Sequence, residues 1–172
     1  HNALLSGSSD SVIENNGEMA VHGDLTISEF DLINQGTVEQ TSAIYGYSRL
    51  STLGPVAITN HGTWQHTIPV GWTQTYAPDQ QLVFENHGLV DVAGVTGTST
   101  ELAGEIRQSA TGEILIHDSL LQLANVSSTA TASSLHGNIL GDETARLLVN
   151  RGTHVFHVDS VINVNQAEFV NT

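Results

Sequence analysis

Histidines are the first candidates for chemistry in this chain, which has nine of them beside four arginines and no lysine. His61 and His87 each stand one residue before a glycine, within two copies of the phrase Asn-His-Gly. If the two copies occupy equivalent places in neighbouring coils, the imidazoles would lie about 5 Å apart and could share a metal ion. Because two imidazoles alone form a weak site, we predict no metal site and retain both residues only as weak candidates.

Acidic residues at turns are the second candidates, because clustered oxygen ligands favour calcium. Asp24, Asp118 and Asp159 each stand at a corner between two apolar stretches. Asp24 belongs to a coil far from the other two, and neither an Asp-x-Asp-x-Asp-Gly loop nor a Gly-Gly-x-Gly-x-Asp repeat occurs. Calcium at Asp118 and Asp159 therefore stays a weak hypothesis, and we predict no cofactor.

Aromatic residues gather in two long segments, 40–57 and 66–81, which also contain all three prolines. Loops inserted into a solenoid leave from one face and often bind ligands. Exposed aromatic rings suit contact with sugars, because they combine an apolar face with a polar edge. We therefore predict that both segments are coil insertions that bind a ligand. The residues predicted to contact it are Tyr45, Tyr47, Trp72 and Tyr76.

Catalysis is not predicted, because no catalytic constellation is recognisable. A glycosidase or a lyase would need paired carboxylates, or a basic residue beside an anionic sugar, whereas the four arginines are scattered. The sequence also lacks a Gly-x-Ser-x-Gly elbow, a phosphate-binding loop and a dinucleotide fingerprint. The alternative that remains is the β-helix portion of a polysaccharide-active enzyme, either a lyase or a glycoside hydrolase.

A repeated phrase, apolar-x-Asn-x-Gly, organises the chain. Five clean copies occupy residues 13–17, 32–36, 58–62, 84–88 and 148–152, and a degraded copy ends at Gly112. Glycine can supply a positive φ at a corner, and stacked asparagines can form an amide ladder. We therefore assign these residues to structure. They are Asn15, Gly17, Asn34, Gly36, Asn60, Gly62, Asn86, Gly88, Gly112, Asn150 and Gly152.

Strands with alternating apolar residues follow most of these glycines, as at 89–92 and 113–116. Strands that recur in one direction at intervals of 19 to 26 residues pair in parallel only if the chain winds helically. We predict an all-β parallel β-helix, a β-solenoid of about six to eight coils, with Trp64 in its core. The alternative is an antiparallel β-sandwich, which gives no reason for one pentapeptide to recur in one context.

Composition limits the partners of the chain. The formal charge of −14 repels phosphate backbones, and no apolar run reaches the length of a membrane span, so we expect neither nucleic acid nor membrane insertion. The absence of cysteine excludes disulfides and thiolate metal sites. We expect residues 1–172 to form a single solenoid domain, part of a longer protein with further coils or domains.

The Asn-x-Gly phrase at the head of alternating strands, as in 32–39 and 84–92, resembles the repeats of filamentous-haemagglutinin-like bacterial adhesins and autotransporter passenger domains. The resemblance implies a secreted, right-handed β-helix that presents loops to glycans or to host or surface proteins. It brings no active-site residues with it. We therefore expect an adhesive or structural module located outside the cell or at its surface.

Overall fold

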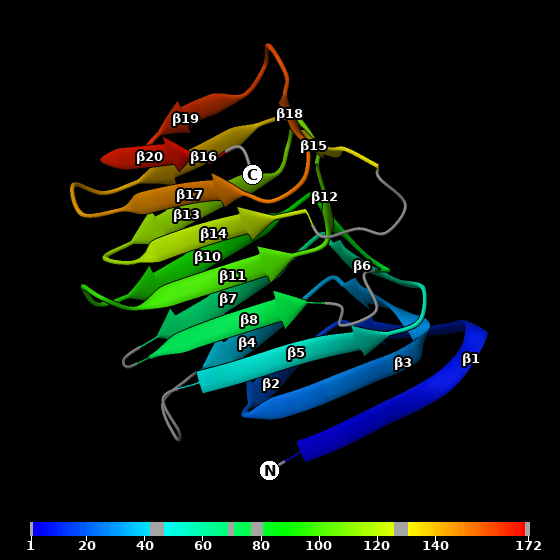
Figure 1. Cartoon of the computed structure of the whole chain (residues 1–172). Coiled ribbons are helices and arrows are strands. Elements are labelled where there is room, and N and C mark those ends of the chain that lie inside the picture. The colour runs from blue at the N-terminus through cyan, green and yellow to red at the C-terminus, as the bar shows by residue number, and fades with distance from the viewer. Residues whose placement is uncertain (1, 42–46, 69–70, 77–80, 126–130, 171–172) are drawn as a thin grey trace.

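The structure, a computed structural model, describes residues 2–41, 47–68, 71–76, 81–125 and 131–170. Within these ranges the regular structure is entirely β-strand, and the strands pair in parallel. The chain winds into a β-solenoid of about 6 turns, with its coils stacked from N- to C-terminus (Figure 1). The predicted parallel β-helix is thus confirmed, and the alternative of an antiparallel sandwich is wrong.

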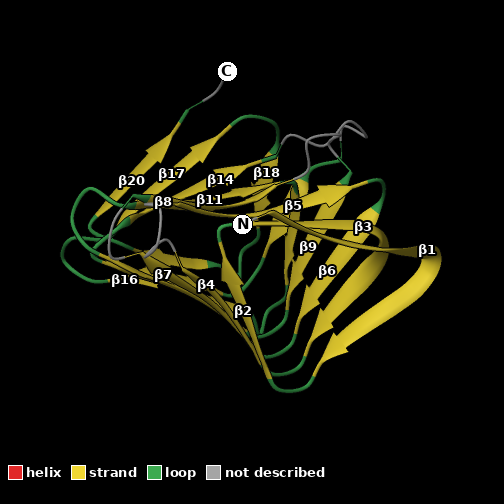
Figure 2. Ribbon diagram, turned by 90° about the horizontal axis from the view of Figure 1, so that it is seen from below, coloured by secondary structure: helices red, strands yellow, loops and turns green. Residues whose placement is uncertain are grey.

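Three sides enclose the interior of the solenoid, and each coil passes along all three in turn (Figure 2). The first side contains the N-terminal halves of β1 (Asn2–Asn15) and β3 (Asp24–Asn34), then β5 (Tyr47–Leu53), β8 (Trp72–Tyr76), β11 (Ser99–Ala103), β14 (Leu120–Ala124), β17 (Arg146–Asn150) and β20 (Gln166–Phe169). The second side contains the C-terminal halves of β1 and β3, then β6 (Val56–Asn60), β9 (Leu82–Asn86), β12 (Glu105–Gln108), β15 (Ser133–Leu135) and β18 (His154–Phe156). The third side contains β2 (Glu18–His22), β4 (Thr37–Thr41), β7 (Thr63–Ile68), β10 (Leu89–Gly94), β13 (Glu113–His117), β16 (Asn138–Gly141) and β19 (Val161–Asn163).

Alternation along each strand determines which residues fill the interior. In β9, for example, Leu82, Phe84 and Asn86 are buried, whereas Val83 and Glu85 are partly exposed. Trp64 of β7 is fully buried, as predicted, and meets Phe84 edge-to-face with ring centroids 5.3 Å apart. Contacts of this kind across the interior hold the three sides together.

The predicted asparagine ladder runs up the end of the second side. Nδ2 of Asn15 donates to Oδ1 of Asn34 at 2.8 Å, and the same bond joins Asn34 to Asn60 and Asn60 to Asn86 at 2.8 and 2.9 Å. Each of these amides also donates to a backbone carbonyl at the start of the third side. The ladder therefore satisfies polar groups that would otherwise be buried without partners.

The ladder ends above Asn86, because two later copies of the phrase do not continue it. Ala110 stands at the asparagine position of the degraded copy. It is Gln108, two residues earlier, that pairs in register with Asn86, and its amide donates to the carbonyl of Gly112 at 2.9 Å. The degraded copy of the phrase is thus a corner that is two residues longer. Asn150 lies at the end of β17 on the first side, so its phrase stands at a different corner, outside the ladder.

The glycines of the repeat form a column beside the ladder, but for a different reason than predicted. The φ angles of Gly36, Gly62 and Gly88 are not positive, and among the predicted structural glycines only Gly152 has a positive φ, of 74°. A Cβ on Gly62 would lie 2.1 Å from the carbonyl oxygen of Gly36 in the coil below. Close stacking of backbones therefore requires glycine in this column.

The two segments predicted as insertions, 40–57 and 66–81, contain strands of the regular coils. β5 pairs with β3 below it and with β8 above it, and β8 pairs in turn with β11, all in continuous parallel register. Prolines and aromatic residues in these segments led to the prediction of loops, but the alternating burial of β5 matches that of its neighbours. The described residues of both segments are therefore regular strands, whereas residues 42–46, 69–70 and 77–80 of the predicted insertions lie outside the described residues.

A polar network lies inside the lower coils, between the first and third sides. His66 is fully buried, and its Nδ1 lies 2.9 Å from Oγ1 of Thr73, which also contacts the hydroxyl of Thr100 at 2.7 Å. Gln40, one coil below His66, accepts a hydrogen bond from Thr75 and donates to two backbone carbonyls. Burial lowers the pKa of His66 to about 3, so the imidazole is neutral at ordinary pH.

Candidate functional site

The outward face of the first side brings together polar side chains from four successive coils. Arg49, Gln74, Glu101 and Gln122 pair in register along β5, β8, β11 and β14. Each is partly exposed, whereas the residues on either side of it point inward. The result is a straight row of hydrogen-bonding groups at the rung spacing of about 4.8 Å.

Bonds between neighbouring rungs order this row. Nε2 of Gln74 donates to Oε2 of Glu101 at 3.1 Å, and Nε of Arg49 lies 3.7 Å from Oδ1 of Asp24 in the coil below. A pocket of about 260 Å³ opens over the same strands, lined by Thr73, Gln74, Ser99, Glu101 and Gln122. These side chains offer both donors and acceptors to a ligand lying along the row.

Of the four aromatic residues predicted to bind a ligand, two border this row. Tyr47 begins β5 and Tyr76 ends β8, both partly exposed, and the guanidinium carbon of Arg49 lies 5.8 Å from the centre of the Tyr76 ring. The backbone of Trp72 pairs in register with Tyr47. Tyr45 lies outside the described residues. Tyr47 and Tyr76 thus belong to a strand face and not to a projecting loop.

Histidines form a second row, at the corner between the second and third sides. His61, His87, His136 and His157 each follow the residue that ends the second-side strand of their coil. Each backbone N–H donates to the carbonyl of the corresponding strand-end residue one coil below, at 2.8 to 3.1 Å. The rings of His61 and His87 stack with centroids 4.9 Å apart, close to the predicted 5 Å, and those of His136 and His157 are 3.7 Å apart.

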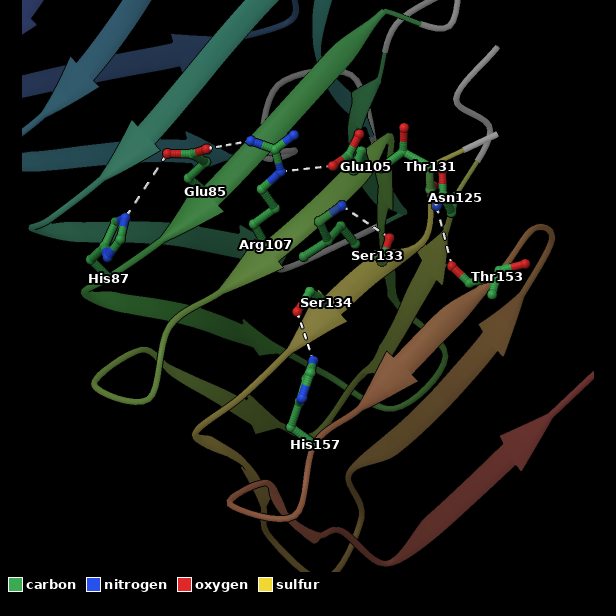
Figure 3. A network of polar contacts seen from close by, with 11 residues as sticks. Glu85, His87, Glu105, Arg107, Asn125, Thr131, Ser133, Ser134, Thr153 and His157 are labelled. Atoms are coloured by element: carbon green, nitrogen blue, oxygen red, sulfur yellow. Dashed lines mark hydrogen bonds and ion pairs between the residues drawn. The ribbon is translucent and has the colours of Figure 1, made fainter. Parts of the chain in front are cut away.

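Between these two histidine pairs, Arg107 holds two carboxylates (Figure 3). Its Nη1 lies 2.9 Å from Oε1 of Glu85 and its Nε 2.7 Å from Oε1 of Glu105. The hydrogen bond with Glu105 raises the pKa of Arg107. Nε2 of His87 lies 4.0 Å from Oε2 of Glu85, which extends the polar cluster to the histidine row. Both carboxylates are thus engaged in binding the same guanidinium.

The two aspartates considered for calcium lie at different corners of the coil. Asp118 stands between β13 and β14 and accepts a hydrogen bond from the hydroxyl of Thr144 at 2.6 Å. Asp159 stands between β18 and β19, where its carboxylate oxygens lie 2.9 and 3.0 Å from Nδ1 of His136. In the part of the chain that the structure describes, no three His, Asp or Glu side chains group as a metal site.

Sequence reasoning missed two kinds of residue in these surfaces. Gln74 and Glu101 look in the sequence like ordinary solvent-facing strand residues, and nothing in their spacing indicates that they lie in one row. His136 was overlooked because Leu135 replaces the expected asparagine, although Leu-His-Gly at 135–137 otherwise repeats the Asn-His-Gly at 86–88. A search for His-Gly at corners would have found it.

Comparison of the chain with models of protein families, with curated proteins and with solved structures gave no match. In the described ranges there is no helix of the length and apolarity needed to cross a membrane. The fold and the two surface rows therefore carry the functional argument.

Proposed function

We propose that this chain is an adhesive module of a bacterial protein, secreted or held at the cell surface, whose first side binds a carbohydrate chain. The β-solenoid supports the proposal, because stacked coils make a rigid, extended surface that can meet a long ligand. The resemblance of the Asn-x-Gly repeats to those of adhesins points in the same direction. A host or surface protein is the alternative ligand.

The observation that carries the proposal is the register of Arg49, Gln74, Glu101 and Gln122 beside Tyr47 and Tyr76. A polysaccharide repeats its hydroxyl groups along one direction, and this row repeats donors and acceptors along one direction. Aromatic rings at the edge of the row offer apolar faces to the C–H surface of a sugar. The row thus combines the two contacts that sugar binding requires.

A glycan array tests the proposal with the untagged chain and two variants. Tyr76→Ala should weaken binding to the best glycan about tenfold, the effect of losing one stacked ring worth about 1.4 kcal/mol. Gln74→Ala should weaken it by a similar factor, because it removes one rung of the row.

The third side offers a matched control, since Gln65 donates to Asp91 at 3.4 Å much as Gln74 donates to Glu101, but without neighbouring tyrosines in register. Gln65→Ala should leave glycan binding unchanged. Absence of binding to any glycan, or equal loss in both glutamine variants, contradicts the proposed surface. Release of reducing ends from a polysaccharide would instead favour the enzyme alternative.

A further inference from the structure

A second pocket lies at the corner where the coils pass from the third side to the first. It has a volume of about 210 Å³ and is formed at three successive corners, between β10 and β11, β13 and β14, and β16 and β17. These corners follow one another along the left edge of the solenoid (Figure 1). Its lining includes Ser99, Asp118, Leu120, Thr144 and Arg146. Three coils thus contribute side chains to one pocket.

Hydrogen bonds fix the carboxylate of this pocket. The backbone N–H of Asp118 donates to Oδ2 of Asp142 at 3.1 Å, and Oδ1 of Asp118 accepts a hydrogen bond from the hydroxyl of Thr144 at 2.6 Å. The backbone N–H of Thr144 donates to Oδ1 of Asp142 at 2.9 Å. Oδ2 of Asp118 has no partner among the described residues. One oxygen is therefore held in place and can accept hydrogen bonds from a ligand.

An arginine supplies donors to the same pocket. Nε of Arg146 donates to Oε1 of Gln166 in the coil above at 3.2 Å, whereas its two Nη groups have no partner among the described residues. Asp118 and Arg146 line the pocket without forming an ion pair with each other. Leu120, one rung below Arg146, is only partly buried. The pocket therefore combines an acceptor, donors and an apolar side chain.

This combination suits an uncharged sugar ring. Each sugar hydroxyl is both a donor and an acceptor, so two neighbouring hydroxyls can donate to Asp118 and accept from Arg146. The C–H surface of the ring can pack on Leu120. Asp118 and Asp142 would repel an anionic sugar, and Arg146 would repel a cationic one. The formal charge of −14 adds to the repulsion of anionic sugars.

The pocket is continuous with the row of the first side. Ser99 lines both this pocket and the one over the row. Ser99 and Glu101 are two residues apart on β11, with the buried Thr100 between them, so both face outward. A carbohydrate chain that lies along the row can therefore place one of its rings at the corner.

We propose that the corner pocket binds one uncharged sugar residue, and that Asp118 and Arg146 select it by the pattern of its hydroxyl groups. The inference rests on the proposed function, because the row would bind the rest of the carbohydrate chain. The row then contributes affinity for an extended chain, and the pocket contributes specificity for one of its residues.

Two variants test the pocket with the glycan that binds best in the array. Asp118→Asn removes the charge and keeps a residue type that tolerates the positive φ of 51° at this position. Arg146→Gln removes the guanidinium. Each variant should weaken binding about tenfold, the effect of losing one charge-assisted hydrogen bond. Glu143→Gln is the matched control, because it removes a negative charge from the same corner outside the pocket, and it should change the affinity less than about twofold.

A measurement on the unaltered chain keeps the test independent of the folding of any variant. The methyl glycosides of glucose, galactose and mannose are titrated while the methyl resonances of Leu120 are followed by NMR. At least one glycoside should shift these resonances saturably, with a dissociation constant on the order of millimolar. Leu53, an exposed leucine outside the pocket, is the control and should not respond.

The outcomes separate the pocket from the row. Leu120 resonances that stay unshifted with all three glycosides, or full glycan affinity in both pocket variants, would overturn the proposed pocket. If Gln74→Ala weakens glycan binding and the pocket variants do not, the row stands without the pocket. If no glycan binds but a methyl glycoside shifts Leu120, the proposed function fails and the pocket remains a sugar site.

Discussion

At the scale of single residues, the side chains that fill the solenoid interior differ between coils, although the sequence phrase at the corners repeats. Thr73, Thr75 and Thr100 stand in the same inward rows that hold leucines in the upper coils. Their hydroxyls are bonded to His66, Gln40 and one another, so the lower coils have a polar interior that depends on complete pairing. Nε2 of His66 is one exception, because it has no hydrogen-bond partner among the described residues, and Oγ1 of Thr52 and Nε1 of Trp64 are two others.

That buried histidine predicts a stability that depends on pH. The pKa of His66 is about 3 in the folded chain and about 6.5 when the chain is unfolded, so below pH 6.5 the unfolded state binds more protons. The free energy of unfolding therefore falls as the pH decreases from 6.5 to 3. Protonation of this histidine in the unfolded state should lower the free energy of unfolding by about 2 kcal/mol between pH 7 and pH 5.

Urea unfolding at pH 7 and pH 5 measures the loss, and His66→Gln isolates the contribution of this histidine from that of the carboxylates. Glutamine is a suitable replacement, because Gln40 fills the same inward row one coil below. The variant should lose about 2 kcal/mol less than the unaltered chain. His117→Gln, at an exposed histidine, is the control and should behave like the unaltered chain. An equal loss in all three would show that the buried imidazole does not cause the effect.

At the scale of elements, the glycine column allows the coils to stack closely at the corner between the second and third sides. The amide that follows each glycine on the third side donates to a glycine carbonyl one coil below, as Leu89 does to Gly62 at 2.9 Å. Any side chain in the column would enter this hydrogen-bonded contact.

Replacing a single glycine by alanine should have a large effect on stability in the middle of the column and almost none at its start. Gly62→Ala should destabilise the chain by about 3 kcal/mol or more, because its Cβ would lie 2.1 Å from a backbone oxygen that cannot move alone. Gly17→Ala should change stability by less than about 0.5 kcal/mol, because nothing lies within 4 Å of its Cβ. Thermal unfolding monitored by circular dichroism compares the two, and similar melting temperatures would contradict the close-stacking explanation.

The sequence predicted the coil where its phrase is regular and failed where the corner changes length or place. Asn34, Asn60 and Asn86 each precede glycine by two residues, so spacing alone gives their register. At Gln108 the corner is two residues longer, and only the pairing of β12 with β9 shows which residue continues the ladder. Asn150 repeats the phrase at another corner, because Asn and Gly suit many turns. The outward row on the first side could not be predicted, because it needs the register of four strands at once.

At the scale of the whole molecule, each coil contacts mainly the coils directly above and below it. The stability of such an array is the sum of the stabilities of its coils and of the interfaces between neighbouring coils. An inner coil therefore has two stabilising interfaces and an outer coil only one. β7, β10 and β13 of the third side have a paired strand on both edges. β19 and β20 end their sheets, and all of their residues are exposed.

Hydrogen exchange measured by mass spectrometry should therefore show a gradient along the solenoid axis. Amides of β7, β10 and β13 should exchange at least about a hundredfold more slowly than those of β19 and β20, because opening an inner coil breaks two interfaces. β16 lies between these groups and should show intermediate protection, which makes the gradient testable within one side. Equal rates along all six strands would mean that the solenoid opens as one cooperative unit, and the additive description of its coils would then be wrong.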